Sequence, residues 1–301
     1  MTDKKAGCGG LGDEDPRRAL AKMIEDAAPR WGRHEVFADF LELSCLAISN
    51  AVDKPQFAAR EARYLEIAKK YPREDFERFP RMLGCLTLAM EQCHATGELE
   101  DVLGAIYMQL DIGNDGAGQF FTPYHVSQLM ARMLVGDGAE ARAKGFLDVM
   151  EPTCGAGGMV IAMADALRQA GLNHQQAMHA TCIDIDARCV HMSYLQLSLL
   201  HIPAVVVHGN SLSLEVWSRW YTPAHVLGGW RRRLERRHAC EEASGLIAEA
   251  ASSATADESP PEAEDRRREP SHVPPHAAAG RREGAAAHAL RASAQMLLFG
   301  D

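Results

Sequence analysis

The amino-acid sequence predicts a doubly wound, Rossmann-like α/β domain preceded by an α-helical domain. Three observations support this fold class. A short apolar run ends in a glycine-rich turn at residues 155–158, two more apolar runs follow with helix-like segments between them, and the first hundred residues carry apolar side chains at helical spacing. Strands that alternate with helices build a parallel sheet, and such sheets bind ligands across the carboxyl ends of their strands.

The predicted helical domain covers residues 15–112. Apolar side chains recur at helical spacing in three segments, separated by Asp53-Lys54-Pro55 and by Tyr71-Pro72. The three segments are residues 36–52, 57–71 and 82–97. We expect about five helices that pack on one another, with the apolar stripes forming a core rather than a binding face. No chemistry is predicted for this domain.

Residues 119–123, QFFTP, follow a predicted glycine-rich loop and precede a predicted helix at residues 124–134. Thr122 stands directly before Pro123, as a helix N-cap stands before a proline in the first turn. An N-cap is therefore the favoured interpretation of Thr122. The alternative is a pocket lined by Phe120, Phe121, Thr122 and Pro123.

The central motif is FLDVMEPTCGAGG, residues 146–158. An apolar run of strand length ends at Glu151-Pro152, and the glycines that follow form a turn with almost no side chains. The helix predicted at residues 159–171 aims its partly positive start at this turn, which favours a bound carboxylate or phosphate. A plain connecting turn is the alternative interpretation.

A dinucleotide-binding fingerprint is disfavoured for this turn. Val160 stands where a third glycine or an alanine belongs. The ribose-binding acid expected about 20 residues further on is also missing, because the next strand-end acid, Asp184, lies 29 residues after Gly155.

Three polar side chains follow the ends of the three predicted strands. Residues 179–186 and 204–208 predict the second and third strands, so Glu151, Asp184 and Asn210 share one rim of the sheet. A carboxylate such as Asp184 accepts hydrogen bonds from both hydroxyls of a ribose, and the amide of an asparagine donates and accepts at an adenine edge. The rim favours a nucleoside-like ligand. Ordinary strand-end polar residues are the alternative.

QFFTP, EPTCGAGG, CIDID and GNSL, in this order and spacing over residues 103–214, resemble the adenine-specific DNA methyltransferases, and most of all the methylation subunits of type I restriction–modification systems. The resemblance implies the fold of an S-adenosylmethionine-dependent methyltransferase, with S-adenosyl-L-methionine as cofactor. It implies DNA as a partner, together with a specificity subunit or another restriction–modification subunit.

The resemblance also implies a role for each matching residue. Phe121, Thr122 and Pro123 would wall the methionine side of the cofactor. Glu151 and the backbone from Cys154 through Gly155 to Gly157 would hold its amino and carboxylate groups. The remaining roles would be ribose binding by Asp184, packing on the adenine by Ile185, and hydrogen bonding to the adenine by Asn210.

The family's catalytic loop, Asn or Asp followed by Pro-Pro and an aromatic residue, is missing from the expected place after GNSL. That loop holds the amino group of a flipped adenine and stacks on the base. The chain instead continues as EVWSRWYTPAHVLGGWRRRLERR, where Trp217, Trp220 and Tyr221 offer either a stacking face or, more often for such clusters, core. Catalytic residues are therefore not assigned. The expected function is adenine methylation of DNA, and the alternative is a catalytically impaired cofactor-binding subunit or regulator.

Composition restricts where such a protein works and how it reaches DNA. The 301 residues carry a formal net charge of −9, so a role on DNA needs a local basic patch or a partner subunit. No apolar run approaches the roughly 20 residues of a membrane span, and the first residues have no apolar stretch typical of a secretory signal. We expect a cytoplasmic location, no metal site, and cysteines that are mostly buried.

The sequence divides into four predicted parts: a flexible N-terminus at 1–14, the helical domain at 15–112, the cofactor-binding domain at 113–230 and a low-complexity tail at 231–301. The tail is rich in Ala, Arg, Glu, Ser and Pro, so we expect no independent fold.

The last eight residues, AQMLLFGD, interrupt this composition with an apolar cluster. Either this cluster docks back on the protein's own domain, or Gln295, Leu298 and Phe299 bind the sliding clamp, whose short peptide ligands they resemble.

Overall fold

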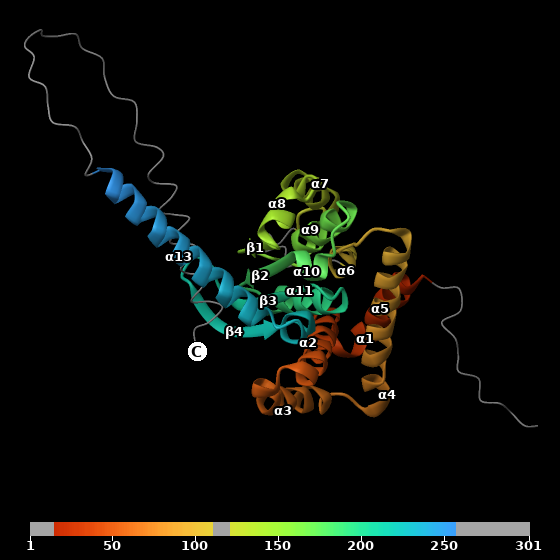
Figure 1. The fold of residues 1–301 in the computed structure, drawn as a ribbon. Coiled ribbons are helices and arrows are strands. Elements are labelled where there is room, and N and C mark those ends of the chain that lie inside the picture. The colour runs from red at the N-terminus through yellow and green to blue at the C-terminus, as the bar shows by residue number, and fades with distance from the viewer. Residues whose placement is uncertain (1–14, 111–120, 257–301) are drawn as a thin grey trace, which may run out of the picture. The chain divides into compact units, whose positions relative to one another are not determined.

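The structure is a computed structural model that describes residues 15–110 and 121–256, with side chains up to residue 244 (Figure 1). The chain divides into two compact units, Met1–Gly228 and Gly229–Asp301. The predicted boundaries inside the first unit stay predictions. In the described residues, no helix combines the length and the apolar character that crossing a membrane requires.

The N-terminal half of the first unit is helical, as the apolar spacing predicts. Its elements are α1 (Pro16–Trp31), α2 (Arg33–Val52), the short 3-10 helix η1 (Lys54–Gln56), α3 (Phe57–Ala68), α4 (Arg73–Phe76), α5 (Arg78–Thr96) and α6 (Val102–Gln109). Asp15 caps α1 by accepting a hydrogen bond from the backbone N–H of Arg17. Gly97 ends α5 in a left-handed conformation that glycine adopts at little cost.

Two helices lead from this half into the sheet, and the strands then alternate with helices. The helices and strands of this part are α7 (Tyr124–Val135), α8 (Ala139–Lys144), β1 (Leu147–Glu151), α9 (Gly158–Gln169), α10 (His174–Ala177), β2 (Met178–Asp184), α11 (Ala187–Leu199), β3 (Ala204–Asn210), β4 (Glu215–Tyr221) and α12 (Pro223–Leu227). The predicted α/β class is confirmed, and each of the three predicted strands is present.

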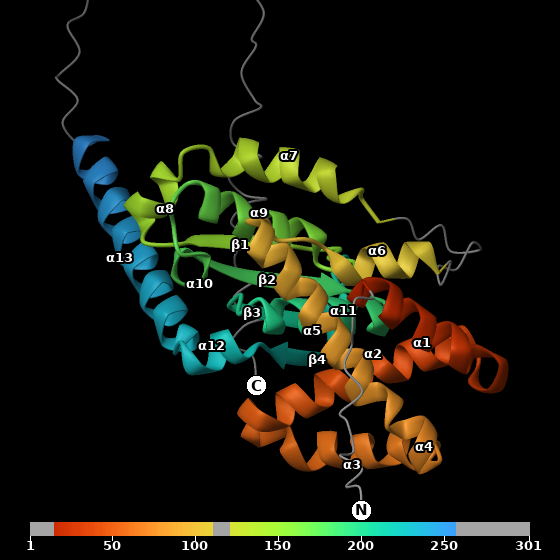
Figure 2. The same ribbon diagram turned by 90° about the vertical axis from the view of Figure 1, so that its right-hand side faces the viewer.

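The four described strands lie side by side in the order β1-β2-β3-β4 (Figure 2). β1, β2 and β3 are parallel, with Glu151 opposite Cys182 and Asp184 opposite His208. The carboxyl ends of these three strands therefore meet at one edge of the sheet, as the predicted rim requires.

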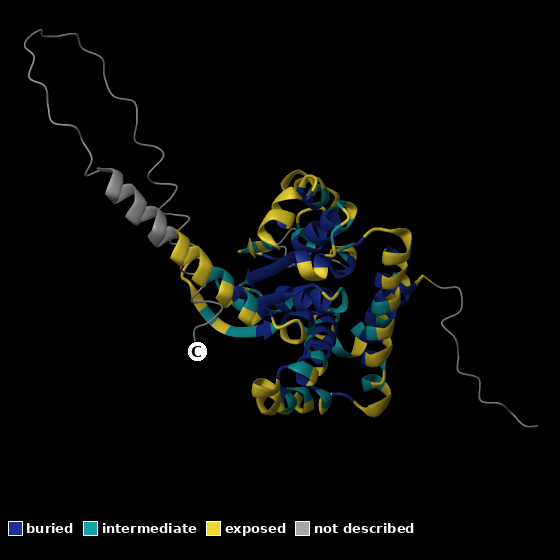
Figure 3. Ribbon diagram, in the orientation of Figure 1, coloured by how far each residue is buried: buried dark blue, intermediate teal, exposed yellow. Residues whose placement is uncertain are grey.

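One buried core joins the helical layer to the sheet. α2 packs against α11, and α7 packs against α9. Ala180 of β2 and Val206 of β3 belong to the same apolar cluster as Phe37 and Phe40 of α2. Figure 3 shows β2, β3 and α11 as mostly buried, whereas much of α7 is exposed. Because α2 rests on α11, the position of the helical half depends on the sheet.

β4 is antiparallel to β3, with Tyr221 opposite Val205 and Glu215 opposite Asn210. Its carboxyl end therefore lies at the edge of the sheet opposite to Glu151 and Asp184. A loop that follows β4 therefore starts at the edge away from the rim, and the segment after GNSL holds no Asn or Asp followed by Pro-Pro and an aromatic residue. In the described sheet, both crossovers run in the same direction, from β1 through β2 to β3.

A buried ion pair fastens α3 and the end of α2 to β4. The Arg60 guanidinium lies 2.6 Å from Oδ2 of Asp53, and both side chains are buried. Arg60 also donates to the hydroxyl of Ser49 and, at 2.7 Å, to the carbonyl oxygen of Arg219. The guanidinium carbon lies 4.2 Å from the ring centroid of Trp220. One side chain thus satisfies polar groups on three elements at once.

The second unit corrects the prediction for the start of the tail. Trp230–Ala256 forms a helix, α13, where a low-complexity chain without its own fold was expected from residue 231. Ala, Arg and Glu are strong helix formers, and the pairs Arg231–Glu235 and Arg237–Glu241 add support at helical spacing. The remaining tail, including Gln295, Leu298 and Phe299, lies outside the described residues.

We expect Arg60→Ala to lower the free energy of unfolding by about 3 kcal/mol, because it leaves the buried Asp53 carboxylate without its counter-ion. Denaturant unfolding followed by circular dichroism measures this loss. Arg63→Ala is the matched control, since Arg63 pairs with Glu42 at a more exposed site, and it should cost less than about 1 kcal/mol. Equal losses in the two variants would contradict the anchoring role of Arg60.

Candidate functional site

The glycine-rich turn between β1 and α9 is the centre of the site. Gly155 has a φ of 53° and Gly157 a φ of 90°, a left-handed conformation that other residues adopt at a cost. Their neighbours would also crowd a side chain at either position. A β-carbon on Gly155 would lie 3.0 Å from the Phe121 ring, and one on Gly157 would lie 3.2 Å from the Ser193 hydroxyl. The backbone of the turn therefore carries no side chain at Gly155 and Gly157, and it packs closely against Phe121 and Ser193.

Three side chains hold the turn in place. The backbone N–H of Gly155 donates to Oδ2 of Asp184 at 2.9 Å. Ser193 donates to the carbonyl oxygen of Gly155 at 2.8 Å, and Gln196 donates to that of Ala156, also at 2.8 Å. The turn is thus fixed by the end of β2 and by two residues of α11.

Thr122 corrects the favoured sequence interpretation. α7 begins at Tyr124, its N-cap is Pro123, and no side chain makes a capping hydrogen bond there. Thr122 instead lines a cavity together with Phe121, so the alternative interpretation describes its position. The threonine that does cap a helix is Thr222, whose hydroxyl accepts a hydrogen bond from the backbone N–H of His225.

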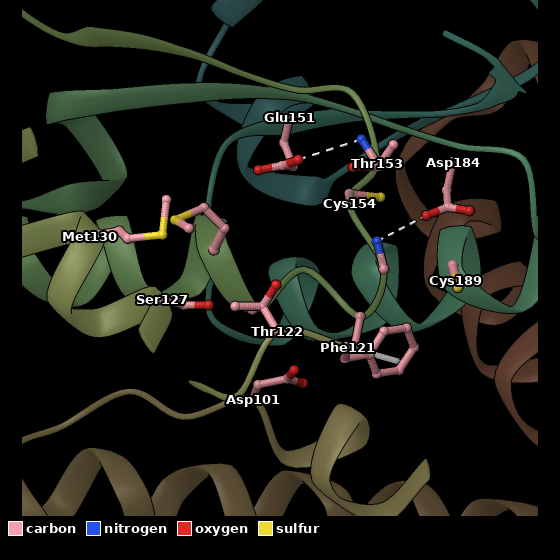
Figure 4. Close-up of a pocket in the computed structure, with 14 residues that line it drawn as sticks. Asp101, Phe121, Thr122, Ser127, Met130, Glu151, Thr153, Cys154, Asp184 and Cys189 are labelled. Atoms are coloured by element: carbon pink, nitrogen blue, oxygen red, sulfur yellow. Dashed lines mark hydrogen bonds between the residues drawn. The ribbon is translucent and has the colours of Figure 1, made fainter. Parts of the chain in front are cut away.

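This cavity has a volume of about 480 Å³, within the usual range for small-molecule sites (Figure 4). The lining residues come from the segment before α6, from α7 and the residues before it, from the glycine-rich turn and the start of α9, from the ends of β1 and β2, and from α11. They are Asp101, Phe121, Thr122, Ser127, Met130, Glu151, Thr153, Cys154, Gly155, Ala156, Gly158, Met159, Asp184 and Cys189. Segments far apart in the sequence therefore meet at one hollow.

The cavity is acidic. Three carboxyl groups line it, those of Asp101, Glu151 and Asp184, and none of the lining residues in the described parts of the chain is Lys, Arg or His. Burial raises the pKa of all three carboxyl groups, and for Glu151 the nearby Asp184 raises the pKa further. A bound cation would reduce the electrostatic repulsion among these carboxylates, whereas the carboxylates would repel a polyphosphate. The cavity thus suits a small ligand with positive charge.

Asp184 keeps acceptor capacity for a ligand. Its Oδ2 accepts from Gly155 and its Oδ1 accepts from the backbone N–H of Asp186 at 2.9 Å. The backbone N–H of Ile185 also donates to this carboxylate. An ionised carboxylate offers about four lone-pair sites, so beside these described donors it can still accept from a ligand hydroxyl.

Cys154 is a buried packing residue rather than a nucleophile. Its side chain is 6% exposed, and its sulfur lies 3.3 Å from the oxygen of the Ser193 hydroxyl. The Cys182 thiol and burial raise the pKa of the Cys154 thiol well above its ordinary value. A thiol that stays protonated is a poor nucleophile.

Four predicted site residues lie outside the cavity lining: Pro123, Gly157, Ile185 and Asn210. Pro123 and Gly157 shape the backbone next to the lining. Ile185 is 60% exposed just beyond β2. Oδ1 of Asn210 accepts from the backbone N–H groups of Leu212 and Ser213, so this side chain closes the β3–β4 turn and leaves only its amide N–H groups for a ligand.

Several lining residues escaped the sequence interpretation. Ser127 and Met130 lie on α7, where their spacing resembles that of a packing face, and Met159 and Cys189 resemble core. Asp101 did carry a signal, since it stands directly before α6 and caps it by accepting from the backbone N–H of Gly104 at 2.8 Å. A capping acid alone does not indicate a site, so only the fold reveals its place in the cavity.

The aromatic cluster of β4 lies elsewhere. Trp217, Trp220 and Tyr221 border a second cavity of about 420 Å³ between α3 and β4. Trp220 is 7% exposed and packs against His191 and Tyr194 of α11. In agreement with the favoured interpretation, Trp220 belongs to the core.

Comparison with known proteins identifies the middle of the chain. Residues 99–227 match the model of the family described as N-6 DNA Methylase. None of the curated proteins is similar enough in sequence to match.

Two solved structures show local similarity. One, described as a class I S-adenosylmethionine-dependent methyltransferase from Listeria monocytogenes, is 13% identical over 65% of this chain and 54% of its own, with a TM-score of 0.35. The other, the methyltransferase subunit of a type I restriction-modification system from Streptococcus thermophilus, is 18% identical over 62% of this chain and 36% of its own, with a TM-score of 0.34. The chain thus spans about half and about a third of the two proteins.

We expect Gly157→Ala to destabilise the fold more than Gly171→Ala does. Both glycines have positive φ, at 90° and 74°, but only a β-carbon at position 157 meets a neighbour, Ser193. The conformational cost of about 1 kcal/mol applies to both variants, and crowding against Ser193 should add about 1 kcal/mol more at position 157. Thermal and denaturant unfolding of the two variants measure the difference. Equal costs would show that the turn has room for a side chain.

Proposed function

We propose that this chain, whose residues 99–227 match the model of the N-6 DNA methylase family, binds S-adenosylmethionine in the acidic cavity and takes part in methylating the exocyclic amino group of adenine in DNA. The cofactor of that family is S-adenosyl-L-methionine, which supplies an activated methyl group. The observation that carries the proposal is the acidic cavity where Phe121 and Thr122, the glycine-rich turn and the end of β2 meet.

The lining residues fit this cofactor by their chemistry. S-adenosylmethionine carries a sulfonium and an ammonium group against one carboxylate, so an acidic wall without basic side chains favours it. The carboxylate of Asp184, which can accept from a ligand hydroxyl, suits the ribose. The bare N-terminus of α9 suits its carboxylate.

Residue roles follow from these positions. Phe121 and Thr122 would border the methionine part of the cofactor, and Glu151 would accept from its amino group. Asp184 would hold the ribose. Ile185, exposed next to Asp184, would pack on the adenine, and Asn210 would reach it through its remaining amide N–H groups.

Calorimetric titration with S-adenosylmethionine tests the binding proposal. Asp184→Asn should weaken binding by about 2 kcal/mol, roughly 30-fold, because a charged acceptor of the ribose hydroxyls is lost. Asp137→Asn is the matched control: Asp137 is exposed in the α7–α8 connection and should bind the cofactor like the wild type. A wild-type protein that ignores millimolar cofactor would refute the proposal.

The catalytic part of the proposal has two versions. In the first, the protein transfers the methyl group itself. In the second, which the antiparallel direction of β4 favours, the chain holds the cofactor and another polypeptide segment supplies the groups that bind the flipped adenine. A specificity subunit or another restriction–modification subunit would then bring the acidic chain to DNA.

Incubation with methyl-labelled cofactor and DNA of mixed sequence separates the two versions. For this chain alone we expect incorporation no higher than that of Asp184→Asn, because no described loop at the rim offers the amide, carbonyl and aromatic ring that hold a flipped adenine. Robust incorporation into adenine by the wild type only would establish the first version.

The proposed route to DNA through the sliding clamp rests on Gln295, Leu298 and Phe299 alone. A tethered clamp-binding peptide would raise the local concentration of the chain at DNA.

A further inference from the structure

Asp101 is held in the cavity wall from several sides. The segment before it is fixed by two contacts at Leu99, whose N–H donates to Oδ1 of Asp165 at 3.0 Å and whose carbonyl oxygen accepts from the hydroxyl of Tyr124. Asp165 belongs to α9 and Tyr124 to α7, so both helices beside the cavity position this segment. A side chain that only capped α6 would not need such anchoring.

The two oxygens of Asp101 have different surroundings. Oδ1 accepts from the backbone N–H of Gly104 at 2.8 Å and from Nε2 of Gln196 at 2.7 Å. Oδ2 lies at the start of α9, where a β-carbon on Gly158 would be 3.0 Å away. Among the described residues, the donors just named bond Oδ1, and the side chain of Asp101 lines the cavity (Figure 4).

Gln196 connects Asp101 to the glycine-rich turn. Its Nε2 donates both to Asp101 and to the carbonyl oxygen of Ala156, and its Oε1 accepts from the backbone N–H of Leu103 at 3.0 Å. The side chain of Gln196 is fully buried. Asp101 is therefore set at a fixed place relative to the turn that would hold the cofactor's carboxylate.

We propose that Oδ2 of Asp101 accepts a hydrogen bond from the amino group of the methionine part of S-adenosylmethionine, an inference that rests on the function proposed above. An ammonium group has three donors, so it can bond Asp101 and Glu151 together. Asp101, beside the start of α9, would accept from the ammonium group of the methionine part. The backbone N–H groups at the start of the same helix would donate to its carboxylate group.

Burial agrees with this role. Desolvation raises the pKa of Asp101, although the bonds from Gln196 and Gly104 oppose the rise. A bound ammonium group would supply the positive charge that this site lacks. Binding should then favour the ionised form of Asp101.

Two ligands separate this role from a structural one. S-adenosylhomocysteine has the amino acid part, whereas 5′-methylthioadenosine keeps the adenine and ribose and lacks the amino acid. Asp101→Asn retains the ability to cap α6, since asparagine is a good N-cap residue, but it carries no charge. Asp101→Ser is a second capping variant without a carboxylate. Calorimetric titration of each folded variant with both ligands gives the affinities, and thermal unfolding confirms the fold.

The expected result is a loss of about 10- to 100-fold in affinity for S-adenosylhomocysteine in both Asp101 variants, with unchanged affinity for 5′-methylthioadenosine. Equal losses for both ligands would overturn the proposal in favour of a structural role for Asp101, and no loss for either would overturn it as well. A wild-type protein that binds neither ligand would overturn the proposed function itself. Where the wild type does bind, Asp184→Asn is the control for binding in this cavity, because it should weaken the binding of both ligands.

Discussion

The site depends on a glycine-rich turn that other residues would form only at a cost. Gly155 and Gly157 combine left-handed backbone with neighbours that would crowd a β-carbon. This bareness lets Asp184 bond the N–H of Gly155 and lets Phe121 lie directly over the turn. It also starts α9 at Gly158 with its N-terminus open to the cavity. Strand, turn and helix thus become one side of a ligand site through a steric constraint, before any ligand is considered.

The helical half contributes to the site rather than merely preceding it. Gln196 of α11 joins the residues around Asp101 to the turn, and Asp165 of α9 holds Leu99. Arg60 performs a similar task at the far edge by joining α3 to β4. Because buried polar groups such as these cost free energy when unsatisfied, the helices and the sheet are expected to unfold together.

The sequence predicts those features that follow from local periodicity and from parallel strand topology. Apolar runs locate β1, β2 and β3, and the carboxyl ends of parallel strands necessarily share an edge, so Glu151 and Asp184 are brought together as expected. What could not be predicted depends on tertiary contacts. The direction of β4 is set by its pairing with β3. Likewise, α7 begins one residue later than a Thr122 cap requires, and the place of Thr122 in the cavity lining is a tertiary feature. Asp101 reads in the sequence only as a capping residue, and its position beside Gly158 depends on the fold.

The central claim is that the acidic cavity holds S-adenosylmethionine. A crystal structure of the protein grown with this cofactor tests it most directly. We expect electron density for the cofactor in the cavity lined by Phe121, Glu151 and Asp184, with the ribose hydroxyls on the carboxylate of Asp184. Cofactor bound elsewhere, for example in the cavity between α3 and β4, or with its ribose away from Asp184, would contradict it.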